Sequence, residues 1–188
     1  MRTLKLQVQM TADGFIGRPE GDPRQLDWMS VGEDEDAIEF IYGMADTSDT
    51  IIMGRKMSPE FLAYWEKIVK EPSNPEYPLA KRMVDKPKII FSKSQKSTSG
   101  VNARMENGDL KTEIEKLKKQ PGKDILVYGG ATFVASLINE NLIDDYYLCI
   151  NPTAIGEGIR IFTGTTRLKL VESTPYKSGV IVNHYKRA

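Results

Sequence analysis

Apolar and polar residues alternate at the start of the chain and later gather into short apolar runs. Residues 4–10 place leucine, leucine, valine and methionine at every second position against lysine and glutamine, which predicts a half-buried strand. The runs over residues 50–53, 88–92 and 124–128 are short and mostly apolar, as strands buried on both faces are. Residues 101–105 alternate again and predict one more strand.

Between these strands, apolar residues recur at helical spacing. The stripe over residues 37–45 predicts a helix that begins at a Ser-x-x-Glu capping box over residues 30–33. Ser58 and Pro59 have the residue types of an N-cap and a first helical position. Asp109 predicts the cap of a helix that runs to Lys119, and another helix is expected over residues 132–139.

The pattern changes towards the end of the chain. Residues 71–78 contain three prolines and predict a loop. After residue 143, strands are predicted over 145–150, 168–173 and 179–185 with no helix between them, which favours antiparallel pairing. The expected architecture is therefore one α/β domain over residues 1–188, with a mostly parallel mixed sheet and antiparallel C-terminal strands.

Composition narrows the possible partners. Lysine plus arginine and aspartate plus glutamate number 26 each, so the formal net charge is zero and argues against broad nucleic-acid or membrane-surface binding. No stretch approaches the ~20 apolar residues of a membrane span, and no signal peptide is evident, so a cytoplasmic location is expected. Cys149 and His184 are single residues of their types, which predicts no disulfide, no metal site and no Ser-His-Asp triad.

Three predicted strands end in residues suited to phosphate. They run into Gly54-Arg55-Lys56, Ser92-Lys93-Ser94 and Gly129-Gly130, and the last pair opens directly into a helix. Ligands of α/β sheets bind at the carboxyl ends of strands, where glycine and a helix N-terminus favour anions. Each element alone also fits a plain turn or a solvated edge. Neither a G-x-G-x-x-G fingerprint with its acidic partner nor a Walker motif is present, which disfavours an ordinary Rossmann domain and an NTPase.

These segments, in this order, resemble the dihydrofolate reductase-like superfamily. Within it the chain is similar to small stand-alone proteins that resemble the C-terminal reductase domain of bacterial riboflavin biosynthesis. The motifs that carry the resemblance are residues 10–17 (MTADGFIG), 50–57 (TIIMGRKM), 89–94 (IIFSKS), 127–131 (VYGGA) and 152–158 (PTAIGEG).

The resemblance implies a three-layer α/β/α sandwich, often dimeric, that uses NADPH to reduce a small heterocycle of pyrimidine or pterin type. A 5-amino-6-(5-phosphoribosylamino)uracil reductase is the reference activity. Arg55 and the Ser92-Lys93 end are alternative sites for the 2′-phosphate of NADPH. The positions that the resemblance assigns to the dinucleotide are Gln9, Ile16, Gly17, Gly54, Arg55, Lys56, Met57, Ser92, Lys93, Gly129, Gly130, Ala131, Thr132 and Phe133.

The substrate side is less specified. Folate reductases place one acidic residue on the helix after the first loop, and here five acidic residues at 33–36 and 39 compete for that role. Asp36 is the predicted proton-delivering group, while Asp13 and Trp28 are candidates for the substrate pocket. A turn-forming role for Asp13 and a core role for Trp28 are the alternatives. Two other functions stay open: a nucleotide sensor without catalysis and an interaction module.

Overall fold

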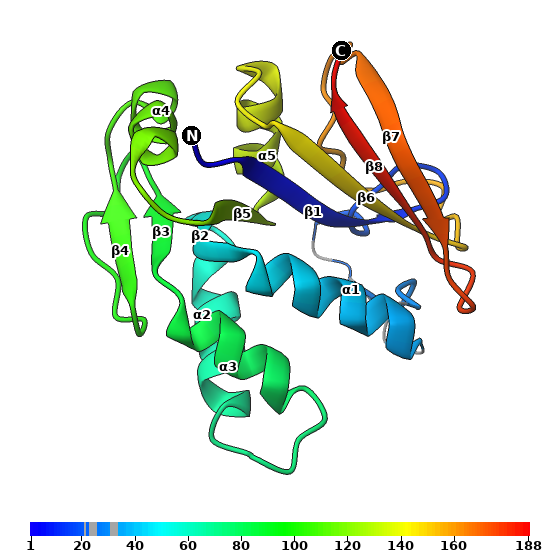
Figure 1. Ribbon diagram of the computed structural model, residues 1–188, viewed down its shortest axis with the longest axis horizontal. Coiled ribbons are helices and arrows are strands. Elements are labelled where there is room, and N and C mark those ends of the chain that lie inside the picture. Colours follow the sequence, from blue (N-terminus) through cyan, green and yellow to red (C-terminus); the bar gives the residue numbers. More distant parts are fainter. Residues whose placement is uncertain (21, 23–25, 31–33) are drawn as a thin grey trace.

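The computed structural model describes residues 1–20, 22, 26–30 and 34–188 and shows one mixed sheet (Figure 1). The sheet has eight strands in the order β4-β3-β2-β5-β1-β6-β8-β7. Strands β1 to β6 run parallel to one another, and β8 pairs antiparallel with both β6 and β7. The strands are β1 (Leu4–Thr11), β2 (Ser48–Gly54), β3 (Lys88–Phe91), β4 (Ala103–Glu106), β5 (Asp124–Gly129), β6 (Asp145–Asn151), β7 (Leu168–Pro175) and β8 (Ile181–Arg187).

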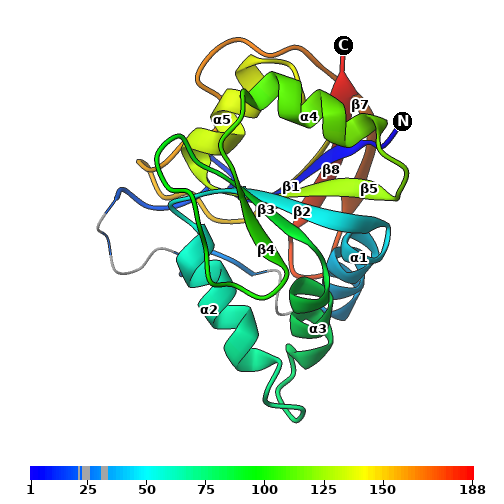
Figure 2. The same ribbon diagram turned by 90° about the vertical axis from the view of Figure 1, so that its left-hand side faces the viewer.

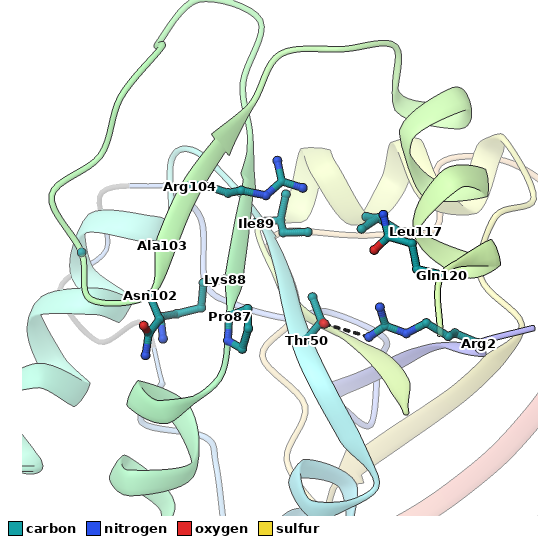
Figure 3. A pocket seen from close by; sticks show the side chains of 11 residues that line it. Arg2, Thr50, Pro87, Lys88, Ile89, Asn102, Ala103, Arg104, Leu117 and Gln120 are labelled. Atoms are coloured by element: carbon teal, nitrogen blue, oxygen red, sulfur yellow. Dashed lines mark hydrogen bonds between the residues drawn. The ribbon is translucent and has the colours of Figure 1, made fainter. Parts of the chain in front are cut away.

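Helices cover both faces of the sheet, as Figures 1 and 2 show. Helices α1 (Glu35–Asp46), α2 (Ser58–Ile68) and α3 (Tyr77–Asp85) lie on one face, and α4 (Leu110–Lys119) and α5 (Ala131–Asn139) lie on the other. Alternation along each strand divides the core accordingly: Ile51 and Met53 pack with α1 to α3, while Ile52 packs with α4 and α5. The predicted α/β/α sandwich with antiparallel C-terminal strands is confirmed.

The first helix begins later than its sequence pattern predicted. Asp34 is the N-cap of α1, and its Oδ1 accepts hydrogen bonds from the N–H groups of Asp36 (3.0 Å) and Ala37 (3.4 Å). The Ser30 cap was therefore wrong, and residues 31–33 of the predicted capping box lie outside the described residues. The Ser30 N–H instead donates to Asn151 Oδ1 at 2.8 Å, so tertiary contact decided the choice.

The loop predicted over residues 71–78 was wrong at its end, because α3 begins at Tyr77 with Pro78 in its first turn. Proline is tolerated there because the first-turn N–H groups have no intrahelical partner. Ser58 likewise is the first residue of α2 and not its cap, which is Met57. Both differences come from the ends of helices, where packing outweighs local residue preference.

The sheet opens between its two central strands. β1 pairs with β5 only from Leu4 to Leu6, whereas it stays paired with β6 as far as Thr11. Beyond Val127, β5 continues beside β2, where Met53 pairs with Gly129. The carboxyl ends of β1 and β5 therefore part, and this is the edge of an α/β sheet at which ligands bind.

Candidate functional site

A cleft of about 740 Å³ lies at the carboxyl edge of the parallel strands. It brings together all three of the strand ends that the sequence singled out, together with the end of β4 and the first turns of α4 and α5. Its lining residues are Gly54, Arg55, Lys56, Phe91, Ser92, Lys93, Ser94, Glu106, Asn107, Gly108, Asp109, Leu110, Gly130, Ala131, Thr132, Phe133, Ser136 and Glu140.

Glycine at two of these positions lets β2 and the start of α5 approach closely. A Cβ on Gly54 would lie 2.7 Å from Phe133 Cβ, and a Cβ on Gly130 would lie 3.3 Å from Gly54 Cα. Gly130 also has φ +92°, which side chains rarely adopt. The two glycines therefore bring the first turn of α5 directly beside the end of β2, at the cleft, where helix N–H groups favour an anion.

Two helices begin beside this point without a side-chain cap. Gly130 is the N-cap of α5 and Met57 is the N-cap of α2, and neither makes a side-chain hydrogen bond to its helix. Uncapped first-turn N–H groups, together with the positive end of the helix dipole, favour a bound anion. The start of α5 lines the cleft directly through residues 131–133.

Three exposed cations stand around the cleft. Within the described ranges, no ion pair joins Arg55 or Lys93 to a carboxylate, and Lys56 lies 3.9 Å from Glu20 with both side chains largely exposed. These cations follow β2 and β3, whose carboxyl ends are neighbours in the sheet. Cations without close partners raise the local potential and suit a ligand that carries several phosphates.

The end of β4 forms a part of the cleft rim that the sequence did not indicate. Glu106, Asn107 and Asp109 line it because β4 pairs parallel with β3 and so ends at the same edge. The hydrogen bond from Arg104 is the main cause that lowers the pKa of the Glu106 carboxyl. The alternation over residues 101–105 predicted a strand, but nothing in the sequence indicated that this strand pairs with β3.

Gln9 lies on β1 beyond the point where β1 leaves β5. Its Oε1 accepts a hydrogen bond from Asn151 Nδ2 at 3.0 Å. The Asn151 amide cannot turn over, because Oδ1 accepts the Ser30 N–H while the two Nδ2 hydrogens are shared among Gln9 Oε1 and the carbonyls of Met10 and Cys149. Gln9 Nε2 is buried and finds no acceptor among the described residues. This donor is held in one orientation beside the opening of the sheet.

Besides Gln9, four predicted cofactor positions do not line the cleft: Ile16, Gly17, Met57 and Gly129. Ile16 donates its N–H to the Ile159 carbonyl, and the Ile159 N–H donates to the Gly17 carbonyl, both at 2.9 Å. Met57 packs over Gly129, since a Cβ on that glycine would lie 2.6 Å from the Met57 sulfur. The segment after β1 is thus joined to the loop around residue 159.

The predicted substrate residues are engaged within the protein. Asp13 Oδ2 accepts the N–H groups of Ile155 (3.0 Å) and Gly156 (2.7 Å). The hydrogen bond from the Thr11 hydroxyl is the main cause that lowers the Asp13 pKa. Trp28 is only 3% exposed. Neither residue lines the cleft, and the contacts of Asp13 are those of a turn that joins two loops.

The acidic start of α1 lies outside the cleft lining. The Asp36 side chain is 71% exposed, and its Oδ2 lies 3.9 Å from Lys177 Nζ. Asp34, besides capping α1, accepts the Ser178 N–H at 2.9 Å, and this bond is the main cause that lowers its pKa. Among Asp34, Glu35, Asp36 and Glu39, no carboxyl lines the cleft.

Cys149 is buried, and His184 contacts neighbouring side chains. Burial raises the pKa of the Cys149 thiol to about 11. His184 Nε2 lies 2.6 Å from Asp145 Oδ1, and its ring stacks on Tyr147. In the described part of the chain, no group of three or more His, Cys, Asp or Glu side chains is arranged to hold a metal ion, and no helix has the length and apolar character needed to cross a membrane.

The strand order, the helical layers and the contact between β2 and α5 define an α/β protein with the dihydrofolate reductase-like fold. More closely, the chain belongs to the RibD C-terminal domain family, whose model matches residues 2–182.

Comparisons with individual proteins agree with this assignment. The chain is 34% identical to the uncharacterized protein YyaP of Bacillus subtilis (strain 168), over 96% of this chain and 92% of YyaP. A crystal structure from Shewanella sp. PV-4, named for riboflavin biosynthesis, matches with a TM-score of 0.74 and 18% identity over 100% of this chain and 99% of that one.

A bifunctional deaminase and 5-amino-6-(5-phosphoribosylamino)uracil reductase from Thermotoga maritima matches with a TM-score of 0.67 and 13% identity, over 100% of this chain and 57% of that one. At this identity the likeness concerns the fold. Family membership supports a reductase-like, oxidoreductase role for the chain.

Proposed function

We propose that the chain is a cytoplasmic, NADPH-dependent reductase of a small heterocycle of pyrimidine or pterin type. One observation carries the proposal: three parallel strand ends, an uncapped helix start and three exposed cations meet in one cleft. Such a cleft fits a long ligand with several phosphates. The bound coenzyme would supply the hydride, while the protein orients it and excludes water.

The pyrophosphate is assigned to the edge where the end of β2 meets the start of α5. Gly54 and Gly130 allow these two segments to pack in direct contact, and the first-turn N–H groups of residues 131–133 supply donors. The 2′-phosphate is assigned to the cationic rim, which Arg55 shares with Ser92 and Lys93. A dinucleotide placed this way would direct its nicotinamide towards the opening between β1 and β5.

The substrate is assigned to the α1 side of that opening. Gln9 offers one buried donor there, and a heterocycle with a carbonyl or ring nitrogen has the matching acceptor. Asp36 stays the predicted proton-delivering carboxyl, and its exposure means that it would act through water. Asp13 and Trp28 would support this side through the loops that they hold.

Calorimetric titration with NADPH and with NADH tests the cofactor. We expect Arg55→Ala to weaken NADPH binding by roughly tenfold and NADH binding much less, because a guanidinium pairs well with a phosphate dianion. Arg167→Ala, another exposed arginine, is the matched control and should change neither affinity. Equal weakening of both coenzymes would remove Arg55 from the 2′-phosphate site.

Turnover is tested separately from binding. Loss of the reduced-nicotinamide absorbance is followed with a panel of pyrimidine and pterin substrates at saturating NADPH. Consumption that depends on one class identifies the substrate chemistry. Tight NADPH binding with no consumption on the whole panel would favour the alternative function, a nucleotide-binding sensor. No heat of association with either coenzyme would overturn the proposed function.

A further inference from the structure

We infer that Asn107 is a positioning residue that holds the turn after β3 in the shape that receives the 2′-phosphate of the dinucleotide. The inference rests on the proposed function. It concerns a residue on β4's rim of the cleft, which the resemblance to known reductases does not assign.

The turn itself uses the Ser92 side chain as an acceptor. Ser92 Oγ accepts the N–H groups of Ser94 (3.2 Å) and Gln95 (2.9 Å). These two bonds occupy both hydroxyl lone pairs, so the hydroxyl can only donate further. Its proton has no acceptor in the part of the chain that the structure describes. A hydroxyl donor beside Lys93, at the wall of the cleft, suits an anion.

Asn107 closes this turn from the neighbouring strand. Its Nδ2 donates to the carbonyl of Ser92 at 2.6 Å and to the carbonyl of Gln95 at 2.8 Å. One amide group therefore ties both ends of the turn and uses both of its hydrogens. The Ser92 N–H donates to the Glu106 carbonyl at 3.0 Å, so backbone and side chain of the β4 end hold the same residue.

Glu106, the acidic residue next to Asn107, is engaged by donors of the protein. Glu106 Oε2 accepts from Arg104 at 2.8 Å, and Glu106 Oε1 accepts the Gly108 N–H at 3.0 Å. Both carboxylate oxygens thus face donors of the protein. Glu106 is thus paired within the protein, whereas Lys93 and Arg55 form no ion pair with a carboxylate of the described residues.

A turn held in advance binds a phosphate more tightly than a loose one, because less ordering remains to be done on binding. The exposed carbonyls of Ser92 and Gln95 can exchange Asn107 for water, so removal of the amide should loosen the turn without unfolding the protein. The effect should fall on the ligand group that touches the turn and spare the rest of the dinucleotide.

The experiment compares two fragments, adenosine 2′,5′-bisphosphate and ADP, by calorimetry on the full chain. We expect Asn107→Ala to raise the Kd of the bisphosphate by roughly tenfold and that of ADP by less than about twofold. Asn107→Asp, which keeps the size but loses the donors, should weaken the bisphosphate at least as much. Asn74→Ala is the matched control, since Asn74 makes similar loop contacts far from the cleft.

The outcomes separate the inference from the proposed function. A loss confined to the 2′-phosphate fragment, with the melting temperature of Asn107→Ala within a few degrees of the parent, supports the positioning role. Equal weakening of both fragments, or weakening of neither, overturns the positioning role of Asn107. The proposed NADPH-dependent function would still stand. Absence of any binding of NADPH to the parent protein overturns the proposed function and this inference with it.

Discussion

A buried hydrogen-bond donor without an acceptor is costly, and within the described part of the chain Gln9 Nε2 is such a donor, beside the opening of the sheet. Its amide orientation is imposed by Asn151, whose own amide is fixed by backbone groups of three segments. A donor left unpaired costs about 1–3 kcal/mol in the folded protein. A group kept at such a cost at a predicted ligand edge is consistent with a role in binding.

Gln9→Met should therefore separate stability from function. We expect the variant to be more stable than the parent by about 1 kcal/mol, because an apolar side chain of similar length removes the unpaired donor. Its affinity for NADPH, or its kcat with the identified heterocycle, should fall. Urea unfolding and calorimetry measure the two effects. A less stable Gln9→Met with unchanged binding would contradict the assignment.

Lys88 is a second buried polar residue, but its donor group has hydrogen-bond acceptors. Its Nζ donates to the carbonyls of Met83 (2.8 Å), Val84 (2.9 Å) and Lys86 (2.7 Å), and so it caps the end of α3. Burial lowers the pKa of Lys88 to about 8. Between about pH 8 and 10 the unfolded chain then binds more protons than the folded one, so the free energy of unfolding rises with pH.

Lys88→Met tests this cap. We expect a loss of about 1–2 kcal/mol at pH 7, because three carbonyls at the end of α3 lose their donor. The rise of stability from pH 8 to 10 should become smaller, and Lys86, whose pKa burial also lowers, should account for what is left. Urea titrations at several pH values measure both quantities. An unchanged pH slope would show that Lys88 titrates normally.

At the scale of elements, the start of α5 is the critical junction. It meets the end of β2 at Gly54 and Gly130 and stacks Phe133 on Phe91, with ring centroids 5.2 Å apart. The Asp34 cap is another junction, because it ties α1 to the turn between β7 and β8 through Ser178. Both junctions join segments that are distant in the sequence.

Gly130→Ala should damage the first junction. The added Cβ would sit at φ +92° and 3.3 Å from Gly54 Cα, which costs about 1–3 kcal/mol of stability. It would also push the start of α5 away from β2 and displace the N–H groups assigned to the pyrophosphate, so NADPH affinity should fall by more than about tenfold. Gly164→Ala, which meets open space, is the control. Normal NADPH binding by Gly130→Ala would rule out this placement of the phosphates.

For the whole molecule, the exposed edge of the sheet at β7 is the surface that suits assembly. Among the described residues, β7 has no strand on its outer side, and Leu170 and Val171 are each 52% exposed on it. Such an edge invites pairing with another strand, and two copies of this chain could pair there about a two-fold axis. We propose that the protein forms a homodimer through β7.

Leu170→Lys combined with Val171→Lys should abolish that dimer, because charges on an edge strand oppose pairing. Sedimentation velocity should show a dimer for the parent and a monomer for the double variant, at unchanged helical content. A monomeric parent protein would contradict the proposal. A variant that stays dimeric would move the interface to another surface.

The amino-acid sequence by itself determined most of the helices and strands. It also showed that residues suited to phosphate follow three of the strands. Apolar runs, period-two alternation and glycine after a strand are local signals, and Gly54, Ser92 and Gly130 are therefore identifiable from the sequence alone. The motifs around them also carried the resemblance to the family that the chain belongs to.

Only the tertiary structure decided which of these residues meet. The place of β4 beside β3, the contacts of Asn107, and the parting of β1 from β5 depend on pairing between distant segments, which no local pattern encodes. The same holds for Asp34, Asp36 and Asp13: residue type marked them as candidates, but packing decided that two hold loops and that one faces solvent. The residue types of the candidate site can be recognised from the sequence, whereas the arrangement of these residues depends on contacts between segments that are distant in the chain.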